Sequence, residues 1–257
     1  MGTVGKAMSL LELFTTDRPE IGLSELARMA GFDKATARRL LVSLMQHGLV
    51  EQERESRFYR LGAGLVRLAR IRESQFPLLP VAMPIIQRLA GETGETVHLS
   101  EYSARGLSSI HVVESMRANR VSVAVGQMLP LHATASGLAF LAFAERRLRE
   151  KSLAGPLPAF TSHTVGDPAL LTEQIATARR RGYSIGSQGF DEGVFSVAAA
   201  ILGHDGTSIG AVAVASPLVR IGPTEADQYG NAVMQAAHDI SERLGGWPVG
   251  TIKKQAS

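Results

Sequence analysis

The chain has 257 residues, of which 45% are apolar and 20% are charged, with 26 glycines and 11 prolines. This length predicts one or two domains, and the composition is that of a globular protein rather than of a disordered, collagen-like or coiled-coil chain. The absence of cysteine excludes disulfides, thiolate metal sites and a cysteine nucleophile, and it favours a cytoplasmic location. Every apolar run is far shorter than the ~18 residues of a membrane span, so no membrane contact is expected.

The net charge of +3 is unevenly distributed along the chain. Residues 1–75 contain 12 Lys and Arg against 9 Asp and Glu, whereas residues 76–257 contain 15 of each. A basic part joined to a neutral part is typical of a nucleic-acid-binding module attached to a second domain. So small an excess could also be the solvated surface of an ordinary protein, and the motifs within each part decide between these interpretations.

Apolar residues at helical spacing predict helices in the first part over residues 6–16, from Ser24 to a stop at Gly31, and over residues 34–47. Only a short turn separates the second helix from the third, which is the arrangement of a helix-turn-helix. Residues 49–52 and 57–61 then alternate as the two strands of a hairpin, which would form the wing of a winged helix-turn-helix.

The N-terminal half of the third predicted helix is polar and basic, at the position where a recognition helix contacts base edges in the major groove. These side chains could instead simply solvate a surface helix, but the hairpin and the charge asymmetry favour DNA. We expect contacts to the groove from Lys34, Ala35, Thr36, Arg38 and Arg39, and to phosphates from Ser24, Arg57 and Tyr59.

A helix over residues 62–75, apolar on one stripe and basic on the other, is expected to connect the two parts and could pair with a partner chain. Prolines 77, 80 and 84 mark the boundary. The predicted organisation is a winged helix-turn-helix domain over 1–62, a linker helix over 63–77, a second domain over 78–247 and a tail over 248–257, with residues 253–257 disordered.

The second part mixes helical and strand patterns, which predicts an α+β domain with an antiparallel sheet. Strands are expected at residues 96–102, 108–115, 120–125, 194–202 and 207–215. Helices are expected at residues 81–90, 134–144, 169–181 and 224–244.

Three stretches of the chain resemble the IclR family of bacterial transcription regulators. They are residues 23–41 with 59–62, residues 130–137 (PLHATASG) and residues 193–199 (GVFSVAA), within an overall resemblance over residues 6–245. The resemblance implies a winged helix-turn-helix, a linker helix and a GAF-like effector-binding domain, assembled as a homodimer or homotetramer on palindromic, double-stranded operator DNA. Leu138 replaces a usual lysine, Ser196 a frequent cysteine and Ala200 a frequent proline, and residues 186–189 lack the usual acids, which makes the pocket edge less hostile to an anion.

Residues 132–137 precede an apolar helix, whose free N–H groups and positive dipole end could bind a carboxylate. A simpler interpretation is a helix cap made by Thr134 or Ser136. Ser196 would need a buried hydrogen-bond partner, for which the effector is a candidate, whereas the apolar candidates could be plain core and Asp191 plain solvated loop. The expected effector residues are Val121, Val123, Met128, Leu129, His132, Ala133, Thr134, Ser136, Asp191, Phe195, Ser196 and Ala198.

An enzyme is the main rival hypothesis, because residues 206–210 match the hydrolase pattern G-x-S-x-G. A turn precedes this serine and a strand pattern follows it, whereas a nucleophile elbow needs a strand before the serine and a helix after it. The seven histidines lack metal-ligand spacing, so neither a metal nor a cofactor is expected. The prediction is a DNA-binding regulator, more readily a repressor, that responds to a small organic or aromatic acid. The alternatives are a sensory module that acts through a protein partner and a serine hydrolase.

Overall fold

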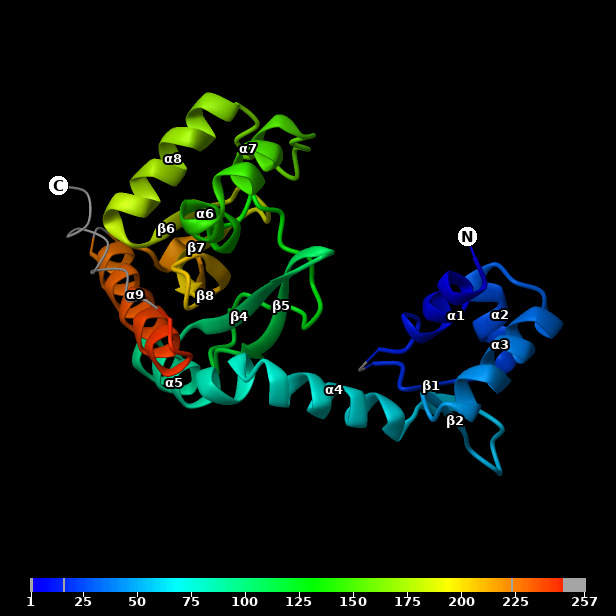
Figure 1. Cartoon of the computed structure of the whole chain (residues 1–257). Helices are drawn as coiled ribbons and strands as arrows, with labels where there is room; N and C mark the ends of the chain where they lie inside the picture. Colours follow the sequence, from blue (N-terminus) through cyan, green and yellow to red (C-terminus); the bar gives the residue numbers. More distant parts are fainter. Residues whose placement is uncertain (1, 16, 223, 247–257) are drawn as a thin grey trace. The chain divides into compact units, whose positions relative to one another are not determined.

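The computed structural model describes residues 2–15, 17–222 and 224–246. The chain divides into two compact units, Met1–Phe76 and Pro77–Ser257, and each combines helices with antiparallel strands (Figure 1). The predicted α+β class is confirmed. The predicted tail, including its disorder at residues 253–257, lies outside the described residues.

The first unit is a winged helix-turn-helix followed by a long exposed helix. Its helices are α1 (Thr3–Leu11), α2 (Leu23–Ala30), α3 (Lys34–Gln46) and α4 (Ala63–Gln75), and its strands are β1 (Glu20–Ile21), β2 (Val50–Gln52) and β3 (Tyr59–Leu61). The antiparallel strands lie in the order β1-β3-β2. Apolar side chains from α1, α2, α3 and the sheet form a single core, which contains Leu10, Ile21, Leu26, Leu41 and Tyr59.

The ends of the first elements differ from the prediction. Helix α1 stops at Leu11 because the chain then folds back, with Thr15 and Arg18 paired in an antiparallel bridge. Helix α2 begins at Leu23 with Gly22 as its N-cap, so Ser24 lies inside the first turn. Strand β1 was not predicted because two residues are too few to show an alternating pattern.

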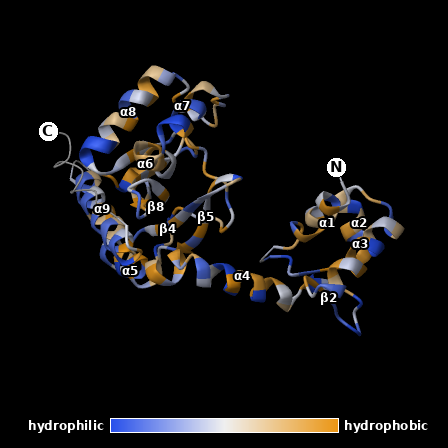
Figure 2. Cartoon of the chain, in the orientation of Figure 1, coloured by the Kyte–Doolittle hydropathy of each residue, from blue (hydrophilic) through white to orange (hydrophobic). Residues whose placement is uncertain are grey.

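Helix α4 has no buried residue among those whose burial the structure describes, and it mixes apolar with polar residues along its length (Figure 2). Its start is held against the turn after α3, where the Gly64 N–H donates to the Gly48 carbonyl at 2.8 Å. A Cβ at Gly64 would lie 2.7 Å from that carbonyl oxygen, so only glycine permits this approach. Val66, Leu68 and Ile71 are left exposed on the helix.

The second unit is built on a five-stranded antiparallel sheet of order β5-β4-β8-β7-β6. Its strands are β4 (Thr96–Ser103), β5 (Gly106–Val113), β6 (Ser184–Ser187), β7 (Val194–Leu202) and β8 (Ser208–Pro217). Its helices are α5 (Leu78–Thr93), α6 (Ala135–Phe143), α7 (Arg146–Ala154), α8 (Pro168–Arg181), the short 3-10 helix η1 (Leu218–Arg220) and α9 (Glu225–Arg243).

Helices cover both faces of this sheet, and the strand alternation decides which side chain meets which layer. Along β7, Phe195 and Val197 point into the core formed with α5 and α9. Ala198 points the other way and packs with alanines of α6 and β8. These small side chains let α6 lie close to the sheet. The N-terminal end of α6 therefore comes near the sheet face that carries Ser196.

Three parts of the second unit differ from the prediction. Residues 120–125 do not form a strand, because the segment bonds to β5 through residues 126–129, around a bridge of Ser108 to Met128, and residues 120–125 run as a loop. Helix α7 was missed because it is polar and has no buried residue, and β6 because it is short. Within the described ranges, no helix is both long and apolar enough to cross a membrane.

Candidate functional site

The turn between α2 and α3 is fixed at both of its ends. Gly31 ends α2 with a left-handed backbone, at a φ of 69°. Asp33 caps α3, because its carboxylate accepts hydrogen bonds from the Thr36 N–H at 2.8 Å and from the Thr36 hydroxyl at 2.7 Å. These bonds lower the pKa of Asp33 below its usual value. The hydroxyl of Thr36 is thus engaged in capping.

Helix α3 presents a basic surface beyond this turn. Its Ala37, Leu40 and Leu41 are buried in the core, which leaves the opposite face in solvent. That face carries the exposed residues Lys34, Ala35, Arg38 and Arg39. Over the described ranges, no ion pair is formed by Lys34, Arg38 or Arg39. The three cations are therefore available to phosphates and base edges.

The hairpin after α3 ends in a turn closed by the Glu53 carboxylate, which accepts from the Ser56 N–H at 2.7 Å. Arg57 is exposed at this turn. Ser24, in the first turn of α2, is exposed as well. Tyr59 is only 4% exposed and packs in the core of the unit. The Tyr59 ring therefore faces inward on its strand, and the phosphate contact of this residue stays a prediction.

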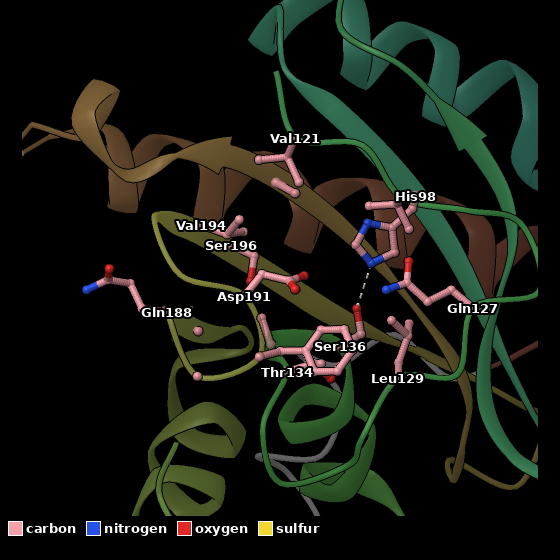
Figure 3. Close-up of a pocket in the computed structure, with 16 residues that line it drawn as sticks. His98, Val121, Gln127, Leu129, Thr134, Ser136, Gln188, Asp191, Val194 and Ser196 are labelled. Carbon is pink, nitrogen blue, oxygen red and sulfur yellow. Dashed lines mark hydrogen bonds between the residues drawn. The ribbon is translucent and has the colours of Figure 1, made fainter. Parts of the chain in front are cut away.

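A pocket of about 50 Å³ opens in the second unit between the start of α6, one face of the sheet and two loops (Figure 3). Its volume is a few times the ~10–15 Å³ that a single water requires. Its lining consists of His98, Val121, Val123, Gln127, Leu129, Thr134, Ala135, Ser136, Gly186, Gln188, Gly189, Phe190, Asp191, Val194, Ser196 and Ala215.

The start of α6 contributes backbone donors to this pocket. Thr134 is the N-cap, since its hydroxyl accepts from the Gly137 N–H at 3.0 Å. Within the described part of the chain, the N–H groups of Ala135 and Ser136 have no partner. A Cβ added at Gly186 would lie 2.9 Å from the Ala135 nitrogen and 3.1 Å from the Ser196 hydroxyl. Glycine therefore keeps open the space that these two polar groups share.

His98 forms part of the wall opposite. It is 5% exposed, and its Nε2 lies 3.1 Å from the Ser136 hydroxyl (Figure 3). Burial lowers the pKa of His98 to about 4, so the ring is neutral near pH 7. Its Nδ1 is buried without a hydrogen-bond partner.

The rest of the lining is mainly apolar, with one charged group among the lining residues at the exposed Asp191. The loop that carries Asp191 is attached to a neighbouring loop, because Thr161 donates to the Gln188 carbonyl at 2.6 Å and Thr164 to the Gly189 carbonyl at 2.7 Å. Phe190 adds an edge-to-face ring contact with Phe160 at 5.1 Å. These contacts position the loop at the pocket.

A buried carboxylate anchors the segment that brings Val121 to the pocket. Glu95 is fully buried and binds Arg220 through two bonds of 2.8 and 2.6 Å and Arg117 at 2.7 Å. Arg220 also donates to the Asn119 carbonyl at 2.6 Å. Arginines on two segments therefore meet on one carboxylate, which fixes the path of the chain toward Val121.

We expect Glu95→Ala to lower the free energy of unfolding by about 3 kcal/mol. The substitution removes the carboxylate that Arg117 and Arg220 share, and it leaves both of these partly exposed arginines without their ion-pair partner. Denaturant unfolding measures this difference. The control is Glu114→Ala, which removes an exposed pair with Arg120 and should change the free energy by less than about 1 kcal/mol. Equal effects of the two substitutions would contradict the anchoring role of Glu95.

Comparison with known proteins assigns both units. Residues 3–54 match the IclR helix-turn-helix domain, and residues 73–242 match the bacterial transcriptional regulator IclR C-terminal domain. The chain belongs to the IclR family. It is 30% identical to the transcriptional repressor IclR of Escherichia coli K12, over 94% of this chain and 89% of the repressor. It is 32% identical to the glycerol operon regulatory protein of Streptomyces griseus, over 93% of this chain and 95% of that protein.

Solved structures of IclR proteins share the fold. An IclR-type protein from Silicibacter sp. TM1040 is 40% identical, with a TM-score of 0.78 over 96% of this chain and 97% of that one. An IclR homologue from Microbacterium hydrocarbonoxydans in complex with 4-hydroxybenzoate is 27% identical, with a TM-score of 0.81 over 95% of this chain and 99% of that one. This IclR chain is accordingly a DNA-binding transcriptional regulator with a helix-turn-helix and an effector domain, and its relatives are regulators rather than enzymes.

The pocket of this IclR protein contains some of the predicted effector residues and not others. Those that line it are Val121, Val123, Leu129, Thr134, Ser136, Asp191 and Ser196. Those that do not are Met128, His132, Ala133, Phe195 and Ala198. Phe195 faces the opposite side of the sheet, Ala198 lies under α6, His132 contacts the Pro158 carbonyl at 3.0 Å, and Met128 is 42% exposed.

Nine lining residues were not among the predicted effector residues, and His98, Gly186 and Phe190 are three of them, although the sequence did place residues 186–189 at the pocket edge. His98 stands between Val97 and Leu99, and both of these are buried on the other face of the sheet. A polar residue between two apolar ones in a strand was a usable signal, because alternate side chains face opposite sides. Gly186 on β6 and Phe190 in the loop that follows gave no comparable local signal, since only the tertiary structure brings them to α6.

The hydrolase-like serine has a structural role. Ser208 begins strand β8 and donates its hydroxyl to the Phe140 carbonyl at 2.6 Å. The chain continues as a strand, so the strand-to-helix turn of a nucleophile elbow is not formed. Across the described residues, no group of three or more His, Asp or Glu side chains could hold a metal ion.

Proposed function

We propose that α3 is the recognition helix and that it enters the major groove of the operator with Lys34, Ala35, Arg38 and Arg39. The unpaired exposed cations at its start support this, because such side chains form the commonest specific contacts to base edges. Ser24 and Arg57 contact phosphates beside the groove, and Thr36 orients the start of the helix. A gel-shift experiment with the DNA upstream of the protein's own gene tests the assignment.

The proposed DNA-binding form is a homodimer, or a homotetramer made of such dimers. Two identical winged helix-turn-helix units match the two halves of a palindromic operator. Helix α4 supports this proposal, since it exposes Val66, Leu68 and Ile71 although it is tied to the winged helix-turn-helix through Gly64. Apolar side chains left in solvent along one helix are typical of a helix that pairs with a second copy. A regulator of transcription acts where the DNA is, so its location is the cytoplasm.

The proposed effector is a small organic acid, with aromatic carboxylates included. The observation that carries this is the space between the free Ala135 and Ser136 N–H groups and the Ser196 hydroxyl, which suits a carboxylate at a helix N-terminus. Binding of 4-hydroxybenzoate by the Microbacterium homologue supports the same class.

Regulation then follows from differential affinity. An acid that binds one conformation of the dimer more tightly than another shifts the population toward it, and operator affinity changes by the same coupling free energy. Repression relieved by the acid is the proposed sign, in keeping with the repressors among its relatives. A sensory module that acts through a protein partner is the alternative, and it predicts no specific shift of the upstream DNA.

Ser196→Ala tests the acid site. We expect the acid to bind roughly tenfold more weakly, because one hydrogen bond to a charged group is lost, while operator affinity without acid is unchanged. Isothermal titration and operator release measure the two quantities. Ser187→Ala, on the exposed end of β6 and outside the pocket, is the matched control. Unchanged acid affinity in the Ser196 variant would remove this residue from the site.

A further inference from the structure

One polar group of the pocket is not used by the acid site. The described residues contain three buried side-chain atoms that lack a hydrogen-bond partner, and the Nδ1 of His98 is the one among them that belongs to a pocket-lining residue. The nitrogen-bearing edge of the ring is turned toward the pocket (Figure 3). Since buried nitrogens are normally satisfied, a bound ligand is a natural partner for this atom.

The position of His98 is determined by the strand pairing. On β4 its neighbours Val97 and Leu99 face the other side of the sheet, and its partner on β8 is Ala213, which leaves the ring room. Nε2 contacts the Ser136 hydroxyl at 3.1 Å. Ser136 also supplies one of the free N–H groups at the start of α6, so His98 and the acid site adjoin one another.

The charge of the surroundings restricts what His98 can bind. The ring is neutral near pH 7, and Asp191 is a nearby anion, so a second carboxylate would meet no compensating charge. A hydroxyl both donates and accepts, and it suits either tautomer of the ring. A keto oxygen only accepts, and it requires a proton on Nδ1 with Ser136 donating to Nε2.

We propose that His98, oriented by Ser136, reads a second, uncharged polar group of the effector, so that the pocket selects hydroxy or keto monocarboxylic acids over plain acids of the same size. The proposal rests on the proposed function, because it requires an acid at the start of α6. His98 is the specificity-determining residue in this scheme, and Ser136 is the positioning residue.

Matched acids test this selection on the full-length protein by isothermal titration. Propanoate is compared with 2-hydroxypropanoate and 2-oxopropanoate, benzoate with 4-hydroxybenzoate, and propanedioate serves as the doubly charged probe. In at least one set, the acid with the hydroxyl or keto group is expected to bind about tenfold more tightly than the plain acid, and propanedioate more weakly than either.

Three variants at one position assign the selection to Nδ1. His98→Asn places an amide near the position of Nδ1 and should retain most of the tenfold ratio, whereas His98→Gln places it near Nε2 and should lose the ratio. His98→Leu should also lose it. Operator affinity without acid and the midpoint of thermal unfolding verify folding, and the Asn and Gln variants decide the matter if the Leu variant does not fold.

The possible failures are distinguishable. If plain acids bind as tightly as their hydroxy and keto counterparts, or if His98→Gln keeps the ratio, the role of His98 is overturned while the acid site stands. Tightest binding of propanedioate would likewise overturn it, because His98 and Ser136 would then bind a second charged group rather than an uncharged one. If no acid in either set binds, the proposed acid effector and the role of His98 both fail.

Discussion

The double variant Arg38→Ala/Arg39→Ala is expected to lose specific operator binding. Each contact of this kind contributes about 1–3 kcal/mol of discrimination, so the loss of two should weaken operator binding by at least about 30-fold. Non-specific DNA binding, which depends on all the cations of the winged helix-turn-helix, should fall much less. Titration of labelled operator and of a scrambled duplex at one fixed salt concentration measures both affinities.

The control for this variant is Arg147→Ala, which removes an exposed arginine from the second unit. It should leave operator affinity unchanged. Stabilisation of the double variant by the acid, measured as a shift in the midpoint of thermal unfolding, should equal that of the parent protein, because the pocket belongs to another compact unit. Loss of operator binding and acid stabilisation together would contradict the separation of the two functions.

The second large effect is expected from Leu68→Ser/Ile71→Ser on α4. These residues are 47% and 48% exposed and lie one helical turn apart, so they share a face. If a second copy covers that face, the two substitutions should raise the dissociation constant of the dimer at least 100-fold, since burial of each side chain contributes about 1.5–3 kcal/mol. Light scattering coupled to size exclusion measures the change in mass.

Operator binding by this variant should fall in parallel and should become equal for the full palindrome and a single half-site. Serine is chosen because it adds no charge that would weaken DNA binding by itself. Arg67→Ser, on the same helix, is the control and should leave the dimer intact. A Leu68/Ile71 variant that remains dimeric at nanomolar concentration would rule out α4 as the dimer contact.

Local signals predicted much of the first unit correctly. The glycine at residue 31 and the helical spacing of Ala37, Leu40 and Leu41 identified the turn and the buried face of α3, because both depend on residues close together in the chain. The burial of Tyr59 was not predicted, because a strand of three residues is too short to show which side of the hairpin faces the core. The same limit applies to residues 120–125, which alternate without a strand partner.

The pocket was predicted only in part, because its residues come from separate segments of the chain. Ser196 and Thr134 were found through local motifs. His98 on β4, Gly186 on β6 and Phe190 in the following loop meet them only when β4, β8, β7 and β6 pair side by side. Such long-range pairing leaves no trace in a single local pattern.

The two domains and their different roles were determined by the sequence alone, because charge, helical spacing and turn residues are local properties of the chain. The identity of the groups that meet in the pocket was decided by the tertiary structure. A strand exposes its two faces to different layers, so the same alternation that buries Phe195 beneath α5 and α9 turns Ser196 toward α6. The residues that a ligand would contact therefore depend on which helix covers which face of the sheet.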